Sequence, residues 1–223
     1  MCVCVCVSST RRLAKNFPHA KQIQGIDLSP YFISIGKQLL KLEPKSFEEG
    51  GPWVSSISND DRIKYTVGDA ADTKLESETF DVVNLQFVLH ELPSEVSLQI
   101  VDEAMRLLKP GGQLWICEMD FESPAYAEQR ANALLFSLIR STEPYLDVYA
   151  ESISDLFRYI QSKSGSVVVV PATGRHYALV ATKNKQEETE GQKFVDLRFD
   201  ESGDYRVEDT HLKAFWESKE EER

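Results

Sequence analysis

The sequence predicts an α/β fold, in which a doubly wound, mostly parallel sheet carries helices on both faces. Strand-like and helix-like segments alternate along the chain, and turns that contain glycine or proline separate several of them. Residues 80–88 (FDVVNLQFV) form an apolar run, typical of a strand buried on both faces of a parallel sheet. With 223 residues, of which 42% are hydrophobic, the chain has room for one such domain and its core.

The first part of the chain supplies two helices and a strand between them. We expect helix over 9–18, strand over 22–27, and a second helix that Ser29 caps and Pro30 opens. In this second helix, apolar residues recur at spacings of three and four and predict a buried stripe: Phe32, Ile35, Leu39 and Leu42. Residues 44–61 are polar and predict a loop.

The remaining elements continue the alternation. A helix is expected to open at Pro93-Ser94 and to end at Lys109, where Pro110-Gly111-Gly112 stops it. Helical segments are expected over 124–141 and 149–162, and further strands over 62–67, 113–118, 166–170 and 176–182. A short turn separates the last two strands, so the final strand should run antiparallel.

The domain organisation follows from a change in composition after residue 182. We expect a body over 1–182 and an acidic linker and tail over 183–223, of which 183–192 is polar throughout. Alternating apolar residues from Val195 to Val207 predict a small hairpin, and a short helix is expected from Thr210 to Ser218.

Charge and cysteine content exclude several classes of function. A net charge of −11 argues against sequence-independent nucleic-acid binding and against docking on anionic membranes by charge. No run of 18 apolar residues is present, so we expect no membrane span. Cys2, Cys4 and Cys6 lack partners for a tetrahedral site, so we read them as a short buried strand and expect no metal. Cytoplasm is the default compartment, and an organellar address stays open if the natural N-terminus is missing.

The residues to inspect for chemistry are those at the carboxyl ends of the strands, where ligands of such sheets bind. Asp27 ends one strand, and its carboxylate can accept hydrogen bonds from both hydroxyls of a ribose; the plain alternative is a helix-capping role. Asp69 ends another strand and could read an adenine edge, or it could bond its own backbone as turn aspartates do.

Four segments in order carry a resemblance to a known family: QGIDLSPYFISIGKQLL, YTVGDA, FDVVNLQFVLHELP and LLKPGGQLWICEMD. Over residues 22–120 they resemble the class I S-adenosylmethionine-dependent methyltransferases of type 11. The resemblance implies a seven-stranded sheet with one antiparallel strand and methyl transfer to a small molecule. It also implies that S-adenosylmethionine is bound by Asp27 and Leu28 at the ribose side, Asp69 and Ala70 at the adenine, and Gln86 beside the methionyl part.

The front end departs from the family pattern. That family has a glycine-rich loop after its first strand, because the backbone there turns sharply beside the cofactor. In this chain Cys4, Val5, Cys6, Val7 and Ser8 occupy that place, and the first glycine is Gly25. We therefore expect reduced or lost cofactor affinity, in a shortened isoform or in a non-catalytic interaction protein that could pair with another copy. A dinucleotide-binding oxidoreductase is disfavoured because no GxGxxG opens a helix.

The acceptor side offers one candidate catalytic residue. His90 follows the apolar strand, and a histidine can take a proton from a nucleophile near neutral pH. The plain alternative is a histidine that packs or caps at a loop, because no partner is visible in the sequence. Glu118 and Asp120 are cofactor-side acids by position and ordinary loop acids by default, and we read Arg175-His176 as a structural turn.

Overall fold

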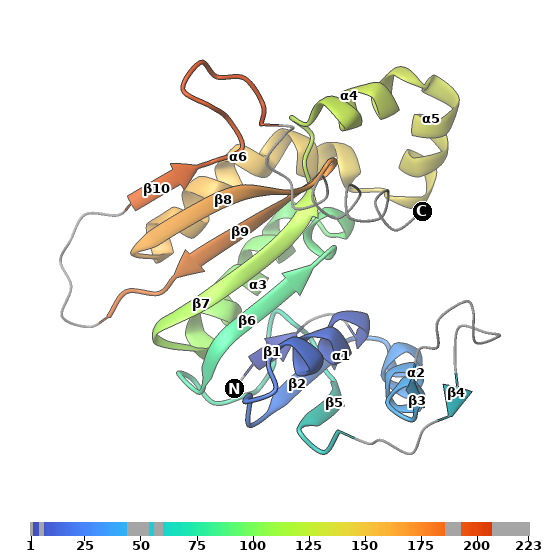
Figure 1. The fold of residues 1–223 in the computed structure, drawn as a ribbon, viewed down its shortest axis with the longest axis vertical. Coiled ribbons are helices and arrows are strands. Elements are labelled where there is room, and N and C mark those ends of the chain that lie inside the picture. The colour runs from blue at the N-terminus through green and yellow to red at the C-terminus, as the bar shows by residue number, and fades with distance from the viewer. Residues whose placement is uncertain (1, 5–6, 44–53, 56–59, 186–192, 207–223) are drawn as a thin grey trace, which may run out of the picture.

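The computed structural model describes residues 2–4, 7–43, 54–55, 60–185 and 193–206. Its main feature is an eight-stranded sheet in the order β10-β8-β9-β7-β6-β1-β2-β5 within these residues (Figure 1). The strands are β1 (Cys2–Cys4), β2 (Ile23–Asp27), β5 (Ile63–Val67), β6 (Phe80–Gln86), β7 (Leu108–Met119), β8 (Ser166–Thr173), β9 (His176–Thr182) and β10 (Lys193–Asp196). A two-residue pair, β3 (Leu42–Glu43) and β4 (Val54–Ser55), stands apart.

The sheet is parallel except at β9, which runs antiparallel to both of its neighbours, β7 and β8. This confirms the mostly parallel sheet and the antiparallel final strand pair. The strand Cys2–Cys4 lies between β2 and β6, in the interior of the sheet. The resemblance implied seven strands, and β10, which pairs in parallel with β8, adds an eighth.

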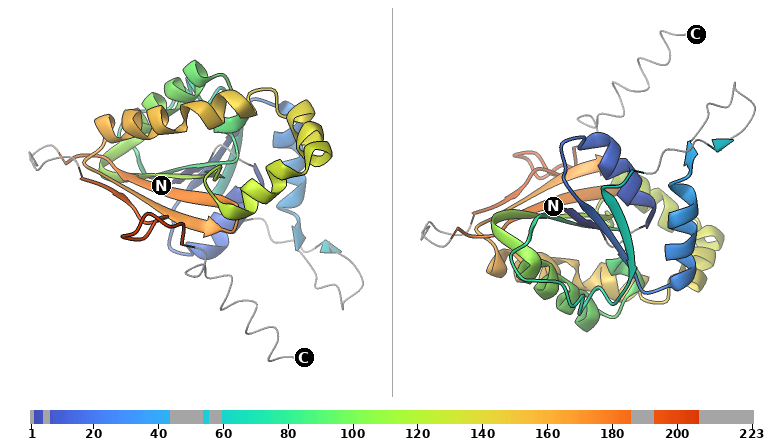
Figure 2. Two further views of the ribbon diagram at one scale, coloured as in Figure 1. Left: turned by 90° about the horizontal axis from the view of Figure 1, so that it is seen from above. Right: turned by 90° about the horizontal axis from the view of Figure 1, so that it is seen from below.

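Helices cover both faces of the sheet (Figure 2). On one face, α3 (Ser94–Leu107) and α6 (Leu146–Lys163) pack against each other and against β6, β7 and β8. On the other, α1 (Val7–Asn16) and α2 (Pro30–Leu39) pack against β2 and β5. A short 3-10 helix, η2 (Leu89–Glu91), follows β6, and α4 (Pro124–Ala131) and α5 (Ala133–Thr142) follow each other with one residue, Asn132, between them. Within the described ranges, each helix is too short or too polar to cross a lipid bilayer.

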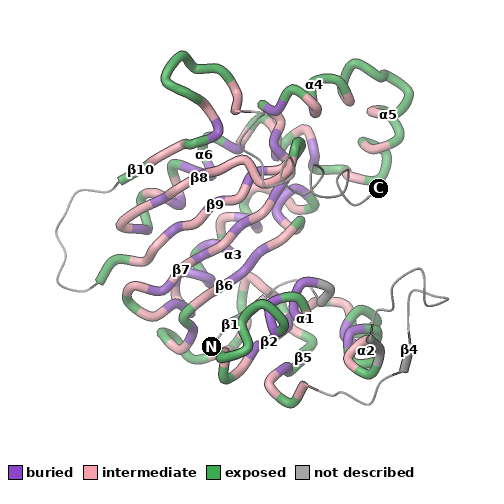
Figure 3. Tube along the Cα trace, viewed as in Figure 1, coloured by how far each residue is buried: buried purple, intermediate pink, exposed green. Residues whose placement is uncertain are grey.

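The core is continuous under α3 and α6, as the purple stretches of Figure 3 show. In β7, buried and half-buried residues alternate, so Leu114, Ile116 and Glu118 face the core together. The apolar run of β6 buries Val83, Asn84 and Leu85 in succession, which confirms that this strand is covered on both faces. A second, smaller cluster forms beneath α1 and α2.

The cap of α2 is confirmed, but the predicted buried stripe is wrong at Phe32 and Ile35; Leu39 is half-buried, and the side chain of Leu42 lies outside the described residues. The Ser29 hydroxyl accepts from the Phe32 amide, and Pro30 is the first helical residue. The helix buries Ile33 and Gly36, whereas Phe32 and Ile35 are 57% and 52% exposed. Two overlapping apolar series run along this helix, and only contact with β2 and β5 decides which one faces the sheet.

Several boundaries also differ from expectation. The segment 124–141 is broken at Asn132, whose side chain accepts from the Leu135 amide and begins a new helix. Helix α3 ends at Leu107, and the following KPGG residues already belong to β7. Gly111 adopts a φ of +78°, which glycine permits at no steric cost.

The residues after 182 add to the sheet through β10, and Phe199 bridges to Tyr205 in antiparallel fashion, as the small predicted hairpin requires. The division of the chain at residue 182 stays a prediction. The expected helix from Thr210 to Ser218 and most of the linker lie outside the described residues, as does most of the loop over 44–61.

Candidate functional site

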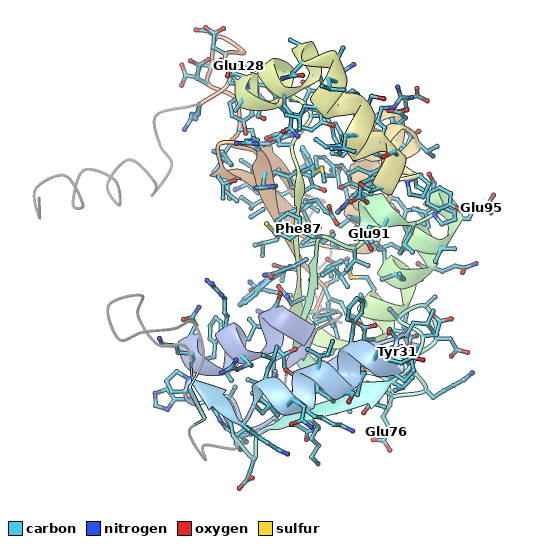
Figure 4. All side chains as sticks on the ribbon, turned by 90° about the vertical axis from the view of Figure 1, so that its right-hand side faces the viewer. Tyr31, Glu76, Phe87, Glu91, Glu95 and Glu128 are labelled. Carbon is cyan, nitrogen blue, oxygen red and sulfur yellow. The ribbon has the colours of Figure 1, made fainter. Side chains whose placement is uncertain are left out.

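The carboxyl ends of four parallel strands, β2, β5, β6 and β7, meet at one edge of the sheet. This edge gathers Asp27, Asp69, Gln86 and Glu118, each of which ends or follows one of these strands. Figure 4 shows Phe87 and Glu91 at this edge, between the part of the molecule that carries α2 and the part that carries α4 and α5. The sequence-predicted site residues are therefore brought to one side of the fold.

The two aspartates lie on neighbouring strands. Asp27 stands opposite Val67 in the register of β2 and β5, and its backbone carbonyl accepts from the Gly68 amide at 3.0 Å. One carboxylate oxygen of Asp27 accepts from the Ser29 amide at 2.8 Å, and one of Asp69 accepts from the Ala71 amide at 2.8 Å. Among the described residues, no hydrogen bond reaches the second carboxylate oxygen of either aspartate. The capping contacts thus leave one acceptor oxygen on each.

The other predicted cofactor-side residues differ in exposure. Leu28 is 72% exposed and Ala70 is half-buried. Gln86 is held from the side of α1: the Ser9 hydroxyl donates to its Oε1 at 2.5 Å, and its amide nitrogen donates to Asn84 at 3.3 Å. Only residues 5 and 6 separate β1 from α1, where the family has its glycine-rich loop.

A buried pair of side chains lies at the β6–β7 side of this edge. His90 is 3% exposed, and its Nδ1 lies 2.6 Å from Oε2 of Glu118, which is fully buried. The second oxygen of Glu118 accepts from the amides of Val88 and Leu89 at 2.7 and 2.8 Å. Glu118 therefore fixes both the imidazole and the turn that carries it, and the structure supplies the partner for His90 that the sequence did not reveal.

The surroundings of His90 favour its charged form. Burial alone lowers the pKa of His90, but the hydrogen bond to Glu118 and the charges of Glu118, Glu143 and Glu91 outweigh it and raise the pKa above 6.5. Burial raises the pKa of Glu91, and nearby carboxylates add to this. The imidazole is thus a stronger base than an exposed histidine.

Nε2 of His90 lies 3.8 Å from a carboxylate oxygen of Glu143, at the end of α5. Donor atoms of His90, Glu91 and Glu143 lie within 4.8 Å of one another, so these are the described residues that could hold a metal ion. Exposed acidic groups are common without a bound cation, and the sequence analysis predicted no metal site.

A second buried network ties the tail to the body. Asp120, fully buried after β7, accepts from the Arg198 guanidinium at 2.9 Å and from the Tyr205 hydroxyl at 2.8 Å. Arg198 also pairs with Asp196, and its guanidinium lies over the rings of Phe157, Tyr177 and Phe199. The tail residues up to 206 are therefore packed on the body.

His176 lies closer to this edge than its reading as a remote structural turn suggests. Its ring stands edge-on to Phe87, with centroids 4.9 Å apart, and Phe87 directly follows Gln86. Phe87 adopts a φ of +54°, an uncommon conformation for a bulky residue. Burial and the adjacent Arg175 lower the pKa of His176.

The sequence pointed to Glu118 and Asp120 as strand-end acids, but it revealed neither their buried partners nor Glu143 and Arg198. The sequence does indicate that Glu118 is buried. Alternate residues of a strand face the same side, so Glu118 must face the core together with Leu114 and Ile116. An acid on a core face needs a partner. No comparable signal marks Glu143 or Arg198.

A comparison with protein families now identifies the chain. The methyltransferase domain family of type 11 matches residues 4–116, just over half of the 223 residues. The chain belongs to this family. The resemblance to class I S-adenosylmethionine-dependent methyltransferases, and the Rossmann-like fold that it implied, are thereby confirmed.

Two curated relatives are similar over part of their length. A demethylmenaquinone methyltransferase of Clavibacter sepedonicus is 29% identical over 104 residues, which cover 47% of this chain and 40% of that protein. One of Bacillus subtilis (strain 168) is 28% identical over 130 residues, which cover 58% and 48%. The match with this chain spans less than half the length of each relative.

Solved structures share the fold at low identity. A SAM-dependent methyltransferase of Methanosarcina mazei aligns with a TM-score of 0.54 and 12% identity, covering 83% of this chain and 92% of its own. A putative S-adenosyl-L-methionine-dependent methyltransferase of Methanococcus maripaludis aligns with a TM-score of 0.53 and 15% identity, covering 83% of this chain and 78% of its own. The structure of PigF with SAH aligns with a TM-score of 0.51 and 15% identity, covering 82% of this chain and 49% of its own.

Proposed function

We propose that this chain transfers the methyl group of S-adenosylmethionine to a small-molecule acceptor. One observation carries the proposal: two aspartates on neighbouring strands and a buried histidine–glutamate pair lie at the same edge of the sheet. Membership of the methyltransferase family supports it. The names of the two curated relatives support a small-molecule acceptor, and the partial overlap limits the proposal to that class.

In this proposal the cofactor lies across the ends of β2, β5 and β6. Asp27 would receive the ribose hydroxyls on its free carboxylate oxygen, with Leu28 beside it, and Asp69 and Ala70 would meet the adenine. Gln86 would lie beside the methionyl part. Hydrogen bonds to a charged carboxylate are stronger than those between neutral groups, so the free aspartate oxygens would contribute most to cofactor affinity.

The acceptor would enter on the side of His90. Its oxygen, nitrogen, sulfur or carbon nucleophile forms a bond to the methyl carbon while the carbon–sulfur bond breaks and sulfur keeps the electron pair. The acceptor proton passes to Nε2 of His90, the ring nitrogen that faces away from Glu118. Positioning of the two reactants supplies most of the rate, and the proton transfer adds to it.

The test is calorimetric titration of the full chain with S-adenosylmethionine and with S-adenosylhomocysteine, followed by a radiolabelled methyl-transfer assay on small acceptors. The front end lacks glycine, so we expect saturable binding weaker than low-micromolar. Low-micromolar binding would overturn the expected loss of affinity while leaving the methyl-transfer proposal intact. Absence of saturable binding to either compound contradicts the enzymatic proposal.

A second candidate function is non-catalytic binding of a partner on the same scaffold. An apolar cavity of about 350 Å³ at the opposite, amino end of the strands favours it; Leu13, Phe17, Ile23 and Trp115 contribute to its lining. Open apolar surface of this kind marks sites of association. Light scattering separates the two candidates: a monomer that binds S-adenosylhomocysteine supports the enzyme, and a homo-oligomer without such binding supports the partner protein.

A further inference from the structure

We infer that Glu118 is a positioning residue, which holds His90 in the one tautomer whose Nε2 lone pair is available to the acceptor. This inference rests on the proposed function for its catalytic consequence, whereas the tautomer itself can be measured in the protein alone. Glu118 ends a strand that also carries core leucine and isoleucine side chains, so its burial is built into β7.

The hydrogen-bond pattern decides the tautomer. Oε1 of Glu118 accepts two backbone N–H groups, from Val88 and Leu89, so this side chain acts as a hydrogen-bond acceptor. With Oε2 accepting as well, the 2.6 Å contact to His90 places the hydrogen on Nδ1. In the neutral imidazole the lone pair is then on Nε2.

The same contacts fix the direction of the ring. His90 lies in η2, whose first residue, Leu89, is bonded to Glu118 through its amide. Tyr149 of α6 stands edge-on to the imidazole, with centroids 6.3 Å apart, and is itself held by Tyr177 at 2.6 Å. The ring therefore has a hydrogen-bonded edge, a packed side, and an Nε2 edge that points toward Glu143.

Each element around His90 contributes a group that bears on its titration. Glu118 comes from β7, Glu91 from η2, Glu143 from the end of α5, and Tyr149 from α6, while His176 of β9 acts at longer range. Glu118 is the one among them in hydrogen-bond contact with the imidazole. Removal of Glu118 should therefore change both the basicity and the tautomer of His90, whereas loss of Glu91 or Glu143 should lower its basicity and leave the tautomer unchanged.

The experiment is a pH titration of ¹⁵N-labelled protein by NMR, in buffer with EDTA and without cofactor. In the wild type we expect the neutral His90 ring to carry its hydrogen on Nδ1 and its pKa to lie above 6.5. Because this readout needs no variant, it holds even where Glu118→Gln fails to fold. A neutral ring protonated on Nε2 would overturn the inference.

In Glu118→Gln we expect the pKa of His90 to fall by about one pH unit or more. The exposed Glu122, in the turn that follows β7, supplies the matched control, Glu122→Gln, which should leave His90 unchanged. Where methyl transfer is measurable, Glu118→Gln should lower kcat about tenfold to a hundredfold with KM for the cofactor little changed. If His90 keeps its pKa and tautomer in Glu118→Gln, the positioning role is wrong whether or not the chain is an enzyme.

Discussion

The two halves of the sheet edge are built differently. On the half where we propose that the cofactor binds, the cofactor half, Asp27 is half-buried and Asp69 is exposed, and each accepts a hydrogen bond from the backbone amide two residues further along. On the half where we propose that the acceptor enters, the acceptor half, Glu118 and Asp120 are fully buried, and each joins segments far apart in the chain. The first half relies on local contacts, and the second on contacts across the fold.

This difference follows from the cost of burying charge. An exposed carboxylate keeps its hydration and needs no partner, so its oxygens stay available for a ligand. A buried carboxylate is tolerated only when it is fully paired, so its position is fixed before any ligand arrives. We therefore expect the acceptor half to be preorganised and the cofactor half to be completed by the ligand that binds to it.

The largest expected effect comes from breaking the buried pair on the acceptor half. Arg198→Leu leaves Asp120 buried without its cation, and we expect a loss of about 3–5 kcal/mol in the free energy of unfolding. Urea denaturation followed by circular dichroism measures it. The control is Arg158→Leu, an ion pair on α6 whose arginine is 74% exposed, where we expect a change within about 0.5 kcal/mol.

A double variant sharpens this result. Replacing both partners, Asp120→Leu with Arg198→Leu, removes the unpaired charge, so its loss should be smaller than the sum of the two single losses. Strict additivity would contradict the direct coupling that the 2.9 Å contact implies.

A smaller effect is expected where the cofactor half is anchored. Glu103 of α3 accepts from the amide and hydroxyl of Thr73, in the loop after β5, and from Arg106. The hydrogen bond from Arg106, helped by those from Thr73, lowers the pKa of Glu103 from 4.5 to about 2. A lowered pKa stabilises the fold above pH 4.5, and this contribution is lost as the pH falls toward 2.

The corresponding variant is Glu103→Gln, for which we expect a loss of about 1.5–3 kcal/mol at pH 7. Urea denaturation from pH 7 to pH 3 should show that the difference in the free energy of unfolding between the variant and the wild type becomes smaller below pH 4.5. Glu95→Gln, an exposed residue of the same helix, is the control. A difference in the free energy of unfolding that does not change with pH would refute the lowered pKa of Glu103 as its cause.

The smallest effect is expected at the cofactor half itself. Asp27→Asn keeps an oxygen for the Ser29 amide but removes the charge, so stability should hardly change while affinity for S-adenosylhomocysteine falls about tenfold. Calorimetry measures the affinity, with Asp155→Asn as an exposed control on α6. Unchanged binding in Asp27→Asn would remove this residue from the cofactor site.

The sequence was informative where local rules decide structure. The cap at Ser29-Pro30, the apolar strand 80–88 and the antiparallel final pair were predictable because each depends on neighbouring residues. The buried face of α2 was mispredicted because two apolar series compete there, and the sheet alone selects Ile33 over Phe32. The partner of His90 lies 28 residues away and that of Asp120 lies 78 away, so no local pattern could join them.

The contrast between the two halves can be tested on matched backbone amides, all of which donate to a carboxylate. Amide hydrogen exchange by NMR should find Val88 and Leu89, bonded to Glu118, strongly protected in the free protein, and Ser29 and Ala71, bonded to Asp27 and Asp69, weakly protected. Saturating S-adenosylhomocysteine should then slow exchange at Ser29 and Ala71 and leave Val88 and Leu89 unchanged. Equal protection in the free protein, or slowing confined to Val88 and Leu89, would contradict a preformed acceptor half and an open cofactor half.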